Sequence, residues 1–192
     1  MNKHVKAASV FLKDKEMAAW HDETLWMVRE KRDKVSREIP EWEALRDAAS
    51  AIKKYSNSHL DTLQQFEANA VANGAVVHWA KDAAEYRDIV YSILSSHNVR
   101  HFIKSKSMLA EECGLNPFLE SKGIDVVESD LGERILQMMH KKPSHIVLPA
   151  IHIRKEEIGA LFTKELGTEP GNNDQTYLTH AARKYLRHKF VE

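Results

Sequence analysis

Apolar residues recur at helical spacing through the first third of the chain. The series that follows Pro40 has steps of three, four and three residues, which is one stripe of a helix. It consists of Trp42, Leu45, Ala49 and Ile52. A second apolar series runs from residue 60 to residue 70 and stops at Asn73 and Gly74, a pair that is typical of a helix end. The pattern predicts a helical arm over residues 1–73.

After Gly74 the pattern changes to short apolar runs that alternate with helical stretches. Four short runs are predicted as strands, and they cover residues 75–80, 99–103, 124–127 and 145–148. Strands this short, separated by helices, require parallel pairing with right-handed crossovers. We therefore expect residues 74–192 to form an α/β domain, a small three-layer, Rossmann-like sandwich around a parallel sheet.

Composition then narrows the class of protein. Lys and Arg number 28, as do Asp and Glu, and this balance argues against a nucleic-acid partner. No apolar run approaches the roughly 18 residues of a membrane span, and none resembles a signal peptide, so we expect a soluble, cytoplasmic protein. The single cysteine, Cys113, excludes a disulfide or a four-cysteine metal site within one copy. We therefore expect no metal and no cofactor in this chain.

The residues that follow the predicted strands are the first candidates for a binding site. In open α/β sheets, ligands lie beyond the carboxyl ends of the strands. The run after the second predicted strand offers two cations and two hydroxyls, and it consists of Lys104, Ser105, Lys106 and Ser107. These groups would bind a carboxylate or a phosphate at a helix N-terminus. The alternative is that Ser107 caps its helix and both lysines are solvated.

Candidate proton-transfer groups follow the third and fourth predicted strands. Glu128 and Asp130, with Glu133 nearby, could act as a general base or pair with the lysines across the crevice. They could equally be ordinary partners of a helix macrodipole. His152 comes after the fourth predicted strand and, as a histidine, could transfer a proton near neutral pH. It is also one of eleven histidines, so a plain loop position is the alternative.

Several long segments together resemble a known family. The segments are residues 104–108, 123–133 and 143–152, with residues 66–84 upstream. They are similar to the LUD domain of lactate utilization proteins, in particular the iron-sulfur subunit. The resemblance implies a component of a three-protein, non-flavin system that oxidises L-lactate to pyruvate in bacteria. It also implies a fold similar to the sugar-phosphate isomerase and coenzyme A transferase superfamily.

The resembled family continues beyond the equivalent of residue 192, with a further LUD segment and a ferredoxin-like region that carries cluster-binding cysteines. The last predicted helix here has no stop signal. We therefore expect an N-terminal portion with an incomplete domain, inactive alone, whose family holds its [4Fe-4S] clusters only in the part that is missing here. Expected partners are other lactate-utilization subunits and a small carboxylate.

An incomplete sheet leaves an open edge, so we also expect self-association through the arm or the last helix. Two other functions stay open. One is a non-catalytic binding and assembly module for the partner subunits. The other, by fold analogy alone, is an enzyme that handles a sugar phosphate or coenzyme A.

Overall fold

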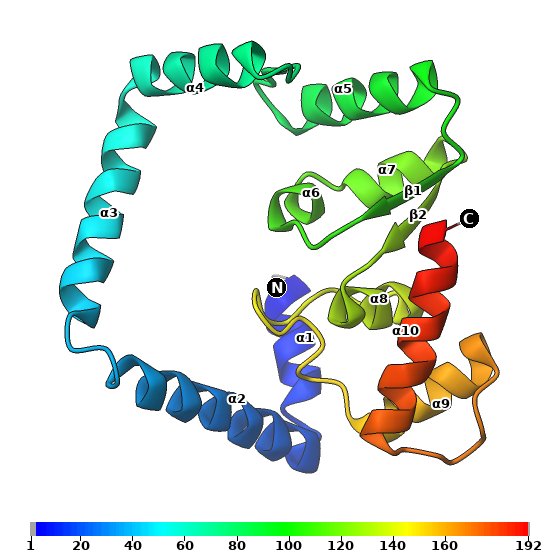
Figure 1. Cartoon of the computed structure of the whole chain (residues 1–192). Helices are drawn as coiled ribbons and strands as arrows, with labels where there is room; N and C mark the ends of the chain where they lie inside the picture. The colour runs from blue at the N-terminus through cyan, green and yellow to red at the C-terminus, as the bar shows by residue number, and fades with distance from the viewer. Residues whose placement is uncertain (1–2, 192) are drawn as a thin grey trace. The chain divides into compact units, whose positions relative to one another are not determined.

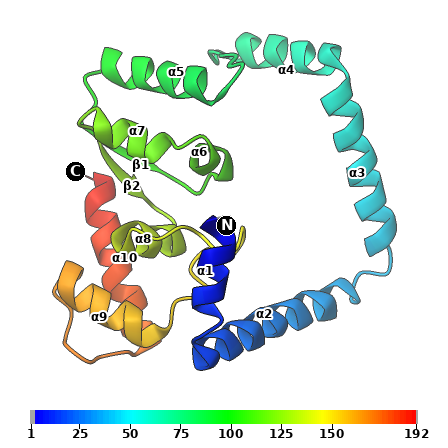
Figure 2. The same cartoon turned by 180° about the vertical axis from the view of Figure 1, so that it is seen from behind.

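A computed structural model describes residues 3–191 of the chain. The chain divides into two compact units, one up to Trp79 and one from Ala80 onward. Figures 1 and 2 show the elements of each unit from opposite sides. The domain boundary expected between residues 73 and 74 stays a prediction.

From residue 3 to Trp79, the regular elements of the first unit are all helices, which agrees with the predicted helical arm. Its helices are α1 (Lys3–Phe11), α2 (Lys15–Ser36), α3 (Trp42–Ser58) and α4 (Leu60–Ala72). Asp14 caps α2, since its carboxylate accepts a hydrogen bond of 2.9 Å from the backbone N–H of Met17. No residue of α2, α3 or α4 is buried. The apolar stripe of α3 therefore faces solvent.

The second unit is mostly helical and contains a small parallel sheet (Figure 1). Its elements are α5 (Ala83–Ser96), β1 (His101–Lys104), α6 (Met108–Glu112), α7 (Leu115–Ser121), β2 (Asp125–Glu128), α8 (Leu131–Met139), α9 (Lys155–Leu166) and α10 (Gln175–Val191). The parallel register pairs His101 with Asp125 and continues to Lys104 and Glu128. The last residues of both strands therefore lie side by side.

Local sequence signals explain where several of these helices begin and end. At four helix starts, a side chain accepts a hydrogen bond from the backbone N–H three residues later. The pairs are Asp82 with Glu85 at 2.9 Å, Ser107 with Ala110 at 3.2 Å, Asp130 with Glu133 at 3.0 Å and Asp174 with Tyr177 at 2.7 Å. Gly167 ends α9 in the left-handed conformation at φ 68°.

Two groups of apolar side chains form the interior of the second unit. The first lies where α5, α6 and α7 cover one face of the sheet, and it contains Leu119, which is fully buried, and Val126 of β2. The second lies among α8, α9 and α10 around Phe162. Val127 follows Val126 and is also buried, so the opposite face of β2 is covered as well.

Two of the four predicted strands do not form, and the prediction of a three-layer Rossmann-like sandwich is not confirmed within residues 3–191. Residues 75–80 and 145–148 are not strands. In the second segment, the backbone N–H groups of Val147 and Leu148 donate to His145 Nδ1 at 3.1 and 3.0 Å. Short apolar runs become strands only when a neighbouring strand takes their backbone hydrogen bonds, and here a side chain takes them instead.

Among the helices of residues 3–191, none combines the length and the apolar character that crossing a bilayer requires.

Candidate functional site

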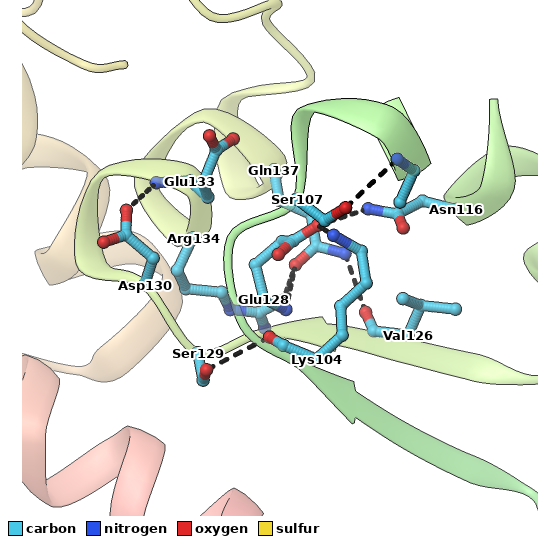
Figure 3. Close-up of polar contacts among 11 residues, drawn as sticks. Lys104, Ser107, Asn116, Val126, Glu128, Ser129, Asp130, Glu133, Arg134 and Gln137 are labelled. Atoms are coloured by element: carbon cyan, nitrogen blue, oxygen red, sulfur yellow. Dashed lines mark hydrogen bonds and ion pairs between the residues drawn. The ribbon is translucent and has the colours of Figure 1, made fainter. Parts of the chain in front are cut away.

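A buried ion pair joins the ends of the two strands. Lys104 Nζ contacts Glu128 Oε1, and the two side chains are only 10% and 4% exposed (Figure 3). The parallel register places these residues opposite each other on the same face of the sheet. The suggestion that a strand-end carboxylate pairs with a lysine is therefore confirmed, whereas the alternative of a solvated Lys104 is wrong.

The ion pair leaves two buried acceptors without a donor. Asn116 of α7 donates from Nδ2 to Glu128 Oε1 at 2.7 Å. Glu128 Oε2 and Asn116 Oδ1 are buried and have no hydrogen-bond partner among the described residues. A buried acceptor without a donor costs about 1–3 kcal/mol. The cluster is therefore suited to accept a hydrogen bond from a hydroxyl, an ammonium group or a water molecule.

Gln137 of α8 fixes the backbone of β2 next to this cluster. Its Oε1 accepts from the Glu128 backbone N–H at 3.2 Å, and its Nε2 donates to the Val126 carbonyl at 2.7 Å. Arg134 donates from Nη1 to the same Oε1 at 2.5 Å and from Nη2 to the hydroxyl of Tyr185 in α10. One polar network therefore connects β2, α8 and α10, and it holds Glu128 in place.

The four predicted anion ligands do not converge as a set. Ser105 is exposed, and Lys106 donates from Nζ to the Val147 carbonyl at 2.9 Å. The Ser107 hydroxyl caps α6, so the alternative prediction of a helix cap at this residue is confirmed. The ammonium of Lys104 is committed to Glu128. Both lysines therefore have partners of their own, so an anion at this site would compete with Glu128 for Lys104 and with the Val147 carbonyl for Lys106.

Carboxylates crowd the first turn of α8. Asp130 caps the helix, and Glu133 lies one turn further on, partly buried. Burial raises the pKa of Glu133 above its usual value of 4.5, and the negative charges of Glu128, Asp130 and Glu111 raise this pKa further, while Lys106 lowers it. A carboxyl group with a raised pKa beside strand ends is a common feature of sites that transfer protons.

His152 lies outside the strand-end network drawn in Figure 3. It belongs to the segment between α8 and α9, where its Nδ1 is 2.7 Å from the Ser144 hydroxyl. Which of the two donates depends on the tautomer. Because residues 145–148 are not a strand, the reasoning that placed His152 at a strand end is wrong. Its role as a proton-transfer group stays a prediction.

Sequence reasoning missed Asn116, Arg134, Gln137 and Tyr185. The sequence contains only a weak indication of the role of Gln137, which is a polar residue next to the buried Leu136 in a short helix. It contains no indication of the role of Tyr185, because the contact with Arg134 joins residues that are 51 positions apart.

The chain's side chains do not fit an iron-sulfur cluster. A [4Fe-4S] cluster is usually held by four cysteine thiolates, and this chain has only Cys113, which is half-buried. In the part of the chain that the structure describes, no group of three or more His, Cys, Asp or Glu side chains is placed to hold a metal ion.

Comparison with known proteins identifies the family. The family model described as LUD domain matches residues 63–192. Lactate utilization protein B of Macrococcus caseolyticus is 38% identical over 166 residues, which cover 85% of this chain and 35% of that protein. The protein of the same name from Geobacillus thermodenitrificans is 41% identical, covering 82% of this chain and 33% of the relative. The one from Bacillus subtilis is 38% identical, covering 86% and 35%.

The chain thus spans about a third of the length of these relatives. No solved structure matches it. Since the family model covers more than half of the chain, the chain belongs to the LUD domain family.

Proposed function

We propose that this chain serves in bacterial lactate utilization, as part of the iron-sulfur protein of a system that oxidises L-lactate to pyruvate. The observation that carries the proposal is the similarity of 82–86% of the chain to relatives named lactate utilization protein B. The chain corresponds to about a third of each relative. In this proposal the chain supplies the site around Lys104 and Glu128 at the ends of β1 and β2. The iron-sulfur clusters belong to polypeptide segments outside this chain.

The polar groups at the strand ends support a small 2-hydroxy carboxylate as the ligand. The carboxylate of L-lactate would bind Lys106 in place of the Val147 carbonyl, while the ammonium of Lys104 stays paired with Glu128. The 2-hydroxyl would donate to Glu128 Oε2, the buried acceptor that has no donor among the described residues. Ser105 and Ser107 stay predicted members of the anion-binding run, although the Ser107 hydroxyl caps α6. Asp130 and His152 remain, with Glu128, the predicted proton-transfer groups.

Ligand binding by the full chain tests this proposal. A ligand that binds only the folded state raises the unfolding temperature in a saturable way. We expect such a shift with L-lactate and a smaller one with propionate, which has the carboxylate but lacks the hydroxyl. Equal shifts with L-lactate, propionate and sodium chloride would contradict the proposed site. Saturable protection by a sugar phosphate, with none by L-lactate, would favour the superfamily analogy instead.

The arm favours a second candidate function, that of an assembly module for the other lactate-utilization subunits. Helices α2, α3 and α4 contain no buried residue, and Leu45 and Ile52 are 57% and 67% exposed. Exposed apolar patches mark surfaces that bind other proteins. The L45D/I52D variant of the full chain should stop co-purifying with the partner subunits, whereas D47N should not. Unchanged co-purification of L45D/I52D would exclude this role for α3.

A further inference from the structure

A groove of about 600 Å³ lies on the second unit, lined by Leu166 at the end of α9 and by residues of α10. Figure 1 shows these two helices. The apolar lining of the groove comes from Leu166 of α9 and from Ala181, Tyr185 and Val191 of α10. Two basic side chains, Lys184 and Arg187, also line it. The groove contains none of the predicted site residues, but its Tyr185 accepts a hydrogen bond from Arg134, which belongs to the network that holds Glu128.

The lining residues of α10 have the spacing of a helix-packing surface. Ala181, Lys184, His188 and Val191 follow one another at steps of three, four and three residues, so they form one stripe along the helix, with Tyr185 and Arg187 beside it. Ten residues of helix extend about 15 Å at 1.5 Å per residue. A groove of that length along a helix accepts the ridge of another helix, in the way that helices pack side by side. A flat lipid surface does not fill a groove.

The charge on α10 defines the chemistry of the occupant. Residues 175–191 contain no Asp or Glu and four Lys or Arg residues, namely Arg183, Lys184, Arg187 and Lys189. Neither Lys184 nor Arg187 forms a salt bridge with a carboxylate of residues 3–191, and the Arg187 guanidinium lies 5.9 Å from the centre of the Phe190 ring. The helix macrodipole favours cations in the last turn, but Lys184 lies two turns before the end of α10.

We propose that this groove binds an acidic amphipathic helix of a partner protein. The partner's apolar side chains would pack on Leu166, Ala181 and Val191. Its carboxylates would face Lys184 and Arg187. This arrangement follows the common mode in which a helix lays its apolar face into a groove, with charge complementarity selecting the partner.

Two synthetic helical peptides test the proposal on the full chain. Both carry leucines at positions i, i+3, i+4 and i+7, and their remaining positions are mostly glutamate in one peptide and mostly lysine in the other. Fluorescence anisotropy should show the glutamate peptide binding about tenfold or more tightly than the lysine peptide, because like charges disfavour the wrong partner. Equal affinities, or no binding of the glutamate peptide, would overturn the proposal.

Matched variants locate the interaction. K184E/R187E should weaken binding of the glutamate peptide about tenfold and should favour the lysine peptide instead. R183E changes a cation of the same helix outside the groove lining and should leave both affinities unchanged. A181F places a ring in the groove and should weaken both peptides, and circular dichroism checks that it stays folded. Equal losses with R183E and K184E/R187E would contradict the assignment to this groove.

Vesicles that contain about a third phosphatidylserine distinguish a lipid surface from a helix, since basic surfaces also attract anionic lipids. Co-sedimentation of the full chain that is lost in K184E/R187E, in the absence of peptide binding, would replace the proposal by membrane attachment. The proposal expects peptide binding without such co-sedimentation.

Discussion

Replacing Lys104 by methionine removes one partner of the buried ion pair and keeps most of the side-chain volume. Glu128, whose side chain is 4% exposed, then keeps the hydrogen bond from Asn116 and loses its cation. Removing one partner of a buried pair typically costs about 3–5 kcal/mol. Because Asn116 still donates to Oε1, we expect K104M to lower the free energy of unfolding by about 3 kcal/mol, near the low end of that range.

Urea unfolding measures this loss, provided that the signal reports on the second unit. All four tryptophans, at positions 20, 26, 42 and 79, precede Ala80, so their fluorescence reports on the first unit. Hydrogen exchange of a peptide that spans β2, followed by mass spectrometry, reports on the site itself. If the free energy of unfolding falls by about 2 kcal/mol per molar urea, a loss of about 3 kcal/mol in stability lowers the urea concentration at the unfolding midpoint by about 1.5 M.

The double variant K104M/E128L supplies the control, because it removes both charges together. We expect K104M and E128L each to be strongly destabilising and the double variant to cost less than the sum of the two. Additive losses, or a K104M loss below about 1 kcal/mol, would refute the conclusion that the pair is buried and coupled.

The remaining predictions concern protonation, packing and capping. Because the pKa of folded Glu133 is raised above 4.5, this group favours the folded state below pH 4.5, and that contribution is lost as the pH rises through the raised value. E133Q should therefore stabilise the protein relative to wild type at pH 8 and much less at pH 4, as thermal melts at both values would show; an equal effect at both would contradict the shift. A Cβ at Gly159 would displace the Asn173 side chain and would lie only 3.3 Å from the backbone carbonyl oxygen of Asn172, so G159A should cost about 1 kcal/mol and lower the melting temperature, whereas A160S at an exposed position should not. D82A removes the cap of α5 and should cost about 1 kcal/mol in urea unfolding; no loss would show that the cap is dispensable.

Local signals in the sequence account for several of the helix ends. Asp82, Asp130 and Gly167 act on backbone groups within a few residues of themselves, so their roles can be predicted without knowing the fold. The strand pair also agrees with the prediction to within two residues at each end. Its parallel direction followed from the helices that lie between β1 and β2.

The parts of the fold and of the site that the sequence did not predict depend on contacts between residues far apart in the chain. Whether residues 145–148 become a strand depends on a neighbour for their backbone groups, and His145 and Lys106 bind those groups instead. The sequence singled out the residues at the strand ends as candidates, but it left open whether Lys104 faces an anion or Glu128. The parallel register decides this, because it places the two side chains next to each other.

Growth on L-lactate tests the proposed function most directly. A strain of the source organism from which the gene is deleted should fail to grow on L-lactate as sole carbon source and should grow normally on pyruvate. The wild-type gene on a plasmid should restore growth on L-lactate, and a gene encoding E128Q should restore it poorly despite equal protein levels. Normal growth of the deletion strain on L-lactate would contradict a role of this chain in lactate utilization.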